Sequence, residues 1–153
     1  MVRRVYVQKK DGFDIEAKNI LHDLQENLQI KDLTDIILLN RYDVSGIDDT
    51  TYEKAKKTVF SEPQVDICFD ETYEFKKEDK VFATEFLPGQ FDQRANSLEE
   101  CLQIISGEKR PIAKSAKVYI LKGNVSDEDV TKIKSYLINR VDSSEASLEK
   151  LET

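Results

Sequence analysis

An apolar pattern recurs along this chain of 153 residues at a separation of 78 positions, and this internal repeat constrains the fold more than any other feature. The matched pairs are Phe13 with Phe91, Ala17 with Ala95, Ile20 with Leu98, Leu24 with Leu102, Tyr52 with Val130, Ala55 with Ile133, and Val59 with Leu137. Between these blocks Val44 aligns with Val125 at a separation of 81, which indicates connecting loops of different length. The repeat predicts a tandem duplication, although any two stretches with the same element order share some of this periodicity.

Each half of the chain predicts the order strand, helix, strand, helix. Alternating or continuous apolar runs indicate strands, and apolar residues spaced by three and four positions indicate amphipathic helices. The predicted strands are 2–10, 35–44, a short 65–69, 81–87 and 116–122, and the predicted helices are 13–28, 48–59, 91–105 and 126–137. Residues 70–79, rich in Asp, Glu and Lys, are expected to form a linker, and Gly107 is expected to cap the third helix.

The predicted fold class is α+β, built by tandem duplication of a βαβα unit. One unit of about 60 residues buries so little surface that it would be only marginally stable by itself. Two units related by a pseudo-twofold axis bury each other's apolar faces. We therefore expect two small sheets or one shared sheet with the helices outside, in a domain spanning 1–142 with repeats at 2–69 and 80–142.

The charge distribution argues against several classes of partner. The formal net charge is −7, from 30 acidic and 23 basic residues, and the basic runs are short and flanked by acids. A nucleic-acid-binding surface needs a basic stripe, and an anionic membrane surface attracts clustered Lys and Arg. The chain has no apolar run long enough to span a bilayer and no signal-peptide pattern. We expect no nucleic-acid or membrane partner and a cytoplasmic location, where its two cysteines stay reduced.

The residue types that carry catalysis are sparse. The single imidazole, His22, lies off the apolar stripe of the first helix, so we expect it on the surface. Cys101 falls between Leu98 and Leu102 and is expected to be a buried structural thiol, and Cys68 lies in a predicted strand. No zinc, calcium, Walker or dinucleotide-binding motif is present. The sequence therefore predicts neither a catalytic group nor a metal or cofactor site in this domain.

The strand-to-helix connection at 87–95 is the strongest candidate for a contact surface. Pro88 and Gly89 suit a type II turn, in which glycine supplies the positive φ. Asp92 can cap the following helix, and three polar side chains project near its start: Gln90, Gln93 and Arg94. The structural interpretation is a turn and a cap, and the functional one is a polar contact surface held by a fixed turn.

A second candidate is the end of the strand at 35–44. Arg41 and Tyr42 are residue types that are enriched in interface hot spots. Arg41 and Asp43 can equally form an ordinary charge pair on a solvated face. The sequence leaves both interpretations open.

Five segments, taken in their order along the chain, resemble a known family. They are Val2–Val7 with Phe13 and Asp14, Leu39–Val44, Val59–Pro63, Leu87–Ala95, and Tyr136–Asn139 with Glu145 and Ala146. The motifs V-F-S-E-P and L-P-G-Q-F-D-Q-R-A are the most specific for this family. Over nearly its whole length the chain resembles the N-terminal region of the large, single-chain phosphoribosylformylglycinamidine synthases.

The resemblance implies a PurS-like pseudo-dimer, related to ferredoxin-like folds, in an enzyme of de novo purine biosynthesis. That enzyme uses ATP and glutamine-derived ammonia to convert formylglycinamide ribonucleotide to the amidine. Its ATP and Mg sites lie in downstream synthetase domains, and its glutaminase cysteine and histidine lie in a C-terminal domain. The N-terminal domain is expected to bridge these two partners, with no cofactor of its own.

The end of the chain departs from the family pattern. Arg140 stands where the resemblance leads us to expect proline, and Ser144 where it leads us to expect arginine. Residues 143–153 are expected to begin a linker to the next domain, so the chain is expected to be a domain of a longer protein. These departures concern the contact with that next domain.

The alternative function is a regulatory module that holds a small molecule between two paired ferredoxin-like units. Its signature is a pocket with convergent polar groups between the repeats. A free-standing enzyme has less support, since the sequence offers no nucleophile with a positioned base.

Overall fold

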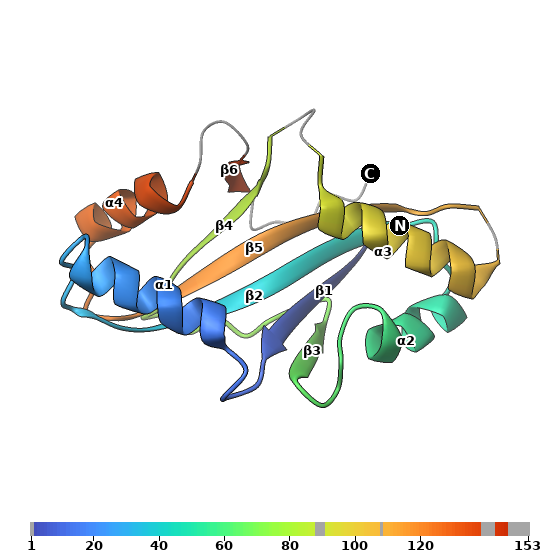
Figure 1. Cartoon of the computed structure of the whole chain (residues 1–153), viewed down its shortest axis with the longest axis horizontal. Helices are drawn as coiled ribbons and strands as arrows, with labels where there is room; N and C mark the ends of the chain where they lie inside the picture. The colour runs from blue at the N-terminus through green and yellow to red at the C-terminus, as the bar shows by residue number, and fades with distance from the viewer. Residues whose placement is uncertain (1, 88–90, 108, 139–142, 147–153) are drawn as a thin grey trace.

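The computed structural model describes residues 2–87, 91–107, 109–138 and 143–146, the last of these by backbone only. It is an α+β fold with one antiparallel sheet of six strands in the order β3-β1-β2-β5-β4-β6 and four helices (Figure 1). The strands are β1 (Val2–Lys9), β2 (Leu33–Ser45), β3 (Asp66–Asp70), β4 (Lys80–Phe86), β5 (Ile112–Gly123) and β6 (Ser143–Ala146). The helices are α1 (Ile15–Glu26), α2 (Asp49–Thr58), α3 (Gln93–Ser106) and α4 (Asp127–Leu137).

The ends of the helices follow the capping residues in the sequence. The side chains of Asp48, Asp92 and Ser126 accept hydrogen bonds from backbone N–H groups in the first turns of α2, α3 and α4. Such acceptors satisfy N–H groups that have no partner within the helix. Gly107 ends α3 in the left-handed conformation, which confirms the predicted C-cap.

All four helices cover the same face of the sheet (Figure 1). The helices form two pairs, each over its own part of that face. The α2 and α3 pair packs on one cluster, and its buried members are Val5, Val7, Tyr42, Val44, Tyr52, Ala55, Phe60, Ala95, Leu98, Leu102 and Ala113. The α1 and α4 pair packs on another, and its buried members are Leu24, Ile30, Leu33, Ile36, Phe82, Tyr119, Leu121, Val125 and Ile133. Each pair therefore joins one helix of the first half to one of the second.

The two halves meet in one shared sheet along the β2–β5 ladder. This ladder runs from Leu33 opposite Gly123 to Ser45 opposite Ile112, with a register shift between Leu33 and Asp35. Both central strands are longer than the sequence predicted. The added residues at their ends, such as Leu33 and Thr34 in β2 and 112–115 in β5, mix apolar and polar types in runs too short to show the alternation that marks a strand.

Residues 71–79 contact the sheet face opposite the helices and are more than a linker. The ring of Tyr73 lies 4.8 Å from that of Phe69 and 6.2 Å from that of Tyr6. Its hydroxyl donates a hydrogen bond of 3.1 Å to the Gln8 side chain. An apolar cluster on this face joins Tyr73 to the buried side chains of four strands. The sheet is thus packed on both faces.

Two further placements differ from the predictions. Ser143–Ala146 pairs with β4 as β6, so the sheet continues beyond the expected domain end at residue 142. Cys101 is exposed, because the buried stripe of α3 runs through Leu98 and Leu102 and leaves the thiol beside it. Among the described helices none is long and apolar enough to cross a membrane. His22 is exposed, as predicted.

The Tyr52 hydroxyl makes the domain sensitive to alkaline pH. Burial, and then its hydrogen bond to the Asp70 carboxylate, raise the pKa of Tyr52 well above its ordinary value near 10. The folded state therefore keeps the phenol neutral while the unfolded state ionises it. The free energy of unfolding is therefore unaffected by this hydroxyl below about pH 10, and it decreases as the pH rises above that value.

We expect Tyr52→Phe to make the loss of stability above pH 10 less steep. The variant removes one phenol that ionises only in the unfolded state. Part of the pH dependence remains, because burial also raises the pKa values of Tyr73 and Tyr119. At neutral pH it should cost about 1 kcal/mol for the lost hydrogen bond. Urea unfolding at pH 8 and pH 11 measures both effects. An equally steep fall in the two proteins would contradict this account.

Candidate functional site

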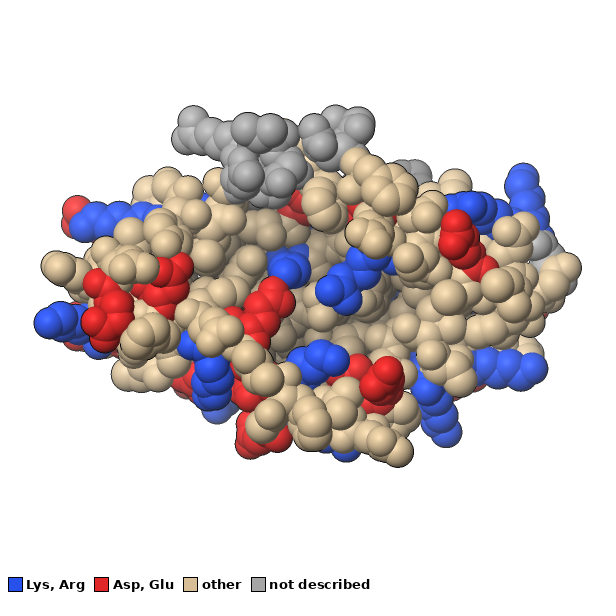
Figure 2. Space-filling model, viewed as in Figure 1, with Lys and Arg blue, Asp and Glu red and all other residues tan. Residues whose placement is uncertain are grey.

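A groove crosses the helix-covered face of the sheet between the two helix pairs. It consists of a cavity of about 720 Å³ and a second of about 230 Å³, and both are lined by Asn40, Tyr42 and Arg94. Figure 2 shows this hollow in the middle of the face, with Lys and Arg side chains in it. The three shared residues place the junction of the cavities over the central strands.

The floor of the groove is polar because the sequence of both central strands changes there. Under the helix pairs, the floor pairings are apolar, such as Ile36 opposite Leu121 and Val44 opposite Ala113. Between them, Asn40 lies opposite Lys117. None of the described helices covers this stretch, so hydrophilic side chains here keep access to water.

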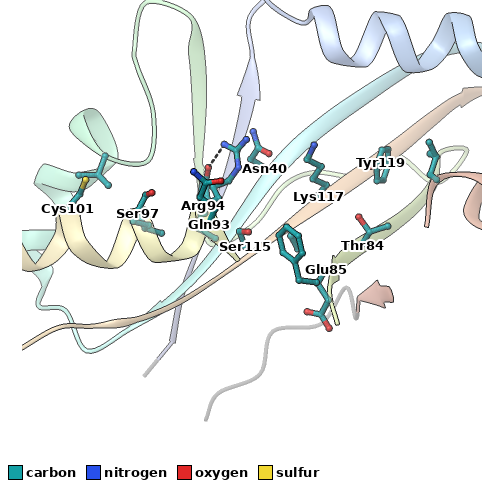
Figure 3. Close-up of a pocket in the computed structure, with 16 residues that line it drawn as sticks. Asn40, Thr84, Glu85, Gln93, Arg94, Ser97, Cys101, Ser115, Lys117 and Tyr119 are labelled. Carbon is teal, nitrogen blue, oxygen red and sulfur yellow. Dashed lines mark hydrogen bonds between the residues drawn. The ribbon is translucent and has the colours of Figure 1, made fainter. Parts of the chain in front are cut away.

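Asp92 fixes the wall of the groove. Its carboxylate accepts hydrogen bonds from the Ala95 N–H at 2.9 Å, the Ser115 N–H at 3.0 Å and the Ser115 hydroxyl at 2.8 Å. One carboxylate thereby caps α3 and attaches it to β5. This attachment positions the next two residues, Gln93 and Arg94, at the cavity (Figure 3).

Arg94 is the most distinctive side chain in the groove. Its Nη1 donates to the Tyr42 hydroxyl at 3.2 Å, and among the described residues no carboxylate oxygen lies within 4.0 Å of its nitrogens. The other described arginines have carboxylate partners: Arg3 with Asp49, Arg4 with Asp43, Arg41 with Asp43, and Arg110 with Glu99. Partial desolvation lowers the pKa of Arg94, but the Tyr42 phenol and the more distant Glu16 and Asp92 carboxylates outweigh it and raise that pKa. Arg94 therefore keeps its charge.

Lys117 is already paired. Its ammonium group donates a hydrogen bond to the Glu16 carboxylate, which comes from the first turn of α1. The pair links β5 to α1, and its two charges compensate each other. Among the described cations that line the groove, Arg94 is therefore the one without an ion-pair partner.

The two neighbouring residues Arg41 and Tyr42 do not belong to one surface. Alternation along β2 places the buried Tyr42 ring on the groove face and Arg41 on the opposite face. Arg41 is only 4% exposed, and its Nε lies 4.0 Å from the Asp43 carboxylate, so this charge pair is buried and not on a solvated face. The carboxylate of Asp43 also accepts two hydrogen bonds from Arg4 of the neighbouring strand.

Some of the contact candidates from the sequence lie at the groove, and others lie outside the described residues. Tyr42, Asp92, Gln93 and Arg94 gather at the groove. Pro88, Gly89 and Gln90 lie outside the described residues. Sequence reasoning missed Asn40, Ser115 and Lys117, which become recognisable only after the β2–β5 register is known.

The side chains that line the groove are suited to binding a ligand through hydrogen bonds. Cys101 lines it as an exposed thiol, and burial raises the pKa of the other cysteine, Cys68, which favours the unreactive thiol form there. Within the described parts of the chain no three His, Cys, Asp or Glu side chains are grouped so that they could hold a metal ion. The arrangement instead presents N–H donors on a guanidinium and a carboxamide, beside aromatic side chains.

Comparison with models of known protein families and with curated proteins finds no match to this chain.

Proposed function

We propose that this chain is a PurS-like interaction domain of a glutamine-dependent amidotransferase, of the phosphoribosylformylglycinamidine synthase type. In this role it contacts the synthetase and glutaminase domains in the cytoplasm and contributes no catalytic group, metal or cofactor. ATP and Mg act in the synthetase domains. The resemblance of the five sequence segments supports the proposal, and so does the arrangement of the sheet.

The sheet arrangement supports the tandem duplication. The order β3-β1-β2 on one side of the centre corresponds to β6-β4-β5 on the other. The antiparallel β2–β5 ladder is the pairing that a pseudo-twofold axis requires at that centre. The exchange of helices between the pairs, with α1 beside α4 and α2 beside α3, is the packing expected of a fused dimer.

The placement of Gln93 and Arg94 on the groove wall is the observation that carries the contact role. Both belong to the most specific segment of the resemblance, and the Asp92 cap holds them where a neighbouring domain can reach them. Rigid scaffolds commonly present their contacts at such strand-to-helix connections.

The test replaces Gln93 and Arg94 together by alanine in an enzyme that carries this domain with its synthetase and glutaminase domains. We expect glutamine-dependent amidine formation to fall about tenfold or more, while activity with free ammonia survives, because lost contact uncouples ammonia transfer from its use. Arg110→Ala, outside the groove, is the matched control. Normal rates with both nitrogen donors would refute the coupling role.

The groove also favours a second candidate, a regulatory module that binds a small molecule. A cavity of about 720 Å³ with polar groups over the seam between the halves is the signature expected of such a module. A thermal-shift screen with amino acids and nucleotides tests it, because a ligand that binds only the folded state raises the melting temperature. Two results together would favour this candidate over the interaction domain: a ligand that raises the melting temperature, and intact glutamine coupling in the enzyme with Gln93 and Arg94 replaced.

A further inference from the structure

Arg94 has unused hydrogen-bonding capacity directed at the groove. A guanidinium carries five N–H donors in a planar fork, and within the described residues Arg94 gives one hydrogen bond, to the Tyr42 hydroxyl. Asn40 lines the same two cavities, and its carboxamide makes no hydrogen bond with any described residue. In Figure 3 the polar ends of Asn40, Arg94 and Lys117 project to the same side of the sheet.

The charges around Arg94 select the kind of ligand. Lys117 is paired with Glu16, so a ligand meets Arg94 as its cation, with the Glu16 and Asp92 carboxylates in the neighbourhood. A phosphate dianion concentrates about two negative charges on one group, more than the single Arg94 charge balances, and the nearby Glu16 and Asp92 carboxylates repel it more strongly than they repel a singly charged group. A carboxylate brings a single charge, and its two oxygens match the planar fork of arginine.

We propose that the groove binds a carboxylate group, held by the Arg94 guanidinium with the Asn40 carboxamide as a second donor. The carboxylate belongs to a free organic or amino acid or to an acidic side chain of a docked polypeptide, and both present the same chemistry. This inference refines the contact proposed for Arg94 above and rests on it. The cavity volume of about 720 Å³ accommodates either source.

The test measures binding on the chain itself, by NMR titration of the Arg94 Nε–H resonance. The probes are succinate, a hexaglutamate peptide and inorganic phosphate, each at matched ionic strength. We expect saturable shifts with the carboxylate probes in the millimolar range. Response to succinate indicates a free acid as the source, and response to hexaglutamate alone indicates a polypeptide segment.

Three variants assign the effect to the groove. For these comparisons, binding is followed by calorimetry. Arg94→Gln should weaken carboxylate binding about tenfold or more, since it removes a charge-assisted bidentate contact. Glu16→Gln should strengthen it severalfold, because it removes a repelling carboxylate and releases Lys117 from its ion pair. Arg110→Gln, which removes an equal charge outside the groove, should leave it unchanged.

Several outcomes overturn the proposal: no saturable response to either carboxylate, tighter binding of phosphate than of succinate, or unchanged affinity in Arg94→Gln. A negative result here leaves the amidotransferase proposal standing, because that proposal depends on the ratio of glutamine-driven to ammonia-driven rates. Conversely, if the enzyme variant shows normal coupling of glutamine use to amidine formation, carboxylate binding by this chain can still be measured separately.

Discussion

Replacing Asp43 by alanine should destabilise the domain by about 3–5 kcal/mol, the typical cost of removing one partner from a buried ion pair. The Asp43 carboxylate accepts hydrogen bonds of 2.7 and 2.9 Å from two nitrogens of Arg4, whose side chain is 4% exposed. A second buried guanidinium, that of Arg41, lies 4.0 Å away. Burial and repulsion from Arg4 lower the pKa of Arg41, and Asp43 opposes that decrease. Alanine would leave two buried cations without this carboxylate.

The measurement is urea unfolding at neutral pH, with Asp127→Ala as the control. Asp127 also forms an ion pair, with Lys80, but its side chain is 93% exposed, so its loss should matter far less. The double variant Arg4→Met with Asp43→Leu should be more stable than Asp43→Ala alone, since it removes the charge together with its partner. Equal effects of Asp43→Ala and Asp127→Ala would refute the burial argument.

Period-2 alternation determines which residues of a strand share a face, and it places Arg41 and Tyr42, grouped as one candidate in the sequence, on opposite faces of β2. The alternation does not reveal that both faces are covered. The helices cover the Tyr42 face, and the segment at 71–79 contributes Tyr73 to the other. An acidic, lysine-rich composition indicated a linker there, because a few aromatic side chains among many charges carry little periodic signal.

The helices were predictable because their signals are local. The apolar spacing of α3, its Asp92 cap and its Gly107 end can all be recognised within a few residues of one another. The groove has no such signal. Asn40 and Lys117 are 77 positions apart in the sequence and become neighbours only through the β2–β5 register, which long-range packing sets.

Gly123→Ala is the second change expected to have a large effect, about 3 kcal/mol or more. Gly123 ends β5 with φ at +111°, a conformation that side chains oppose. An added Cβ would lie 2.2 Å from the Asp32 carbonyl oxygen and 2.9 Å from the Thr34 nitrogen. Both atoms belong to backbone beside the register shift at the start of β2, so neither can rotate away. The ladder that joins the two halves would have to open at this end.

Gly12→Ala separates the two contributions to this loss. Gly12 also has a positive φ, +90°, but an added Cβ there would meet no atom within 4 Å. Its substitution should therefore cost only the conformational strain, about 1–2 kcal/mol. Thermal and urea unfolding of both variants give the two losses in free energy of unfolding. Their difference measures the cost of placing a side chain where β5 closely approaches β2. If the two substitutions destabilise the domain equally, that close approach contributes nothing to its stability.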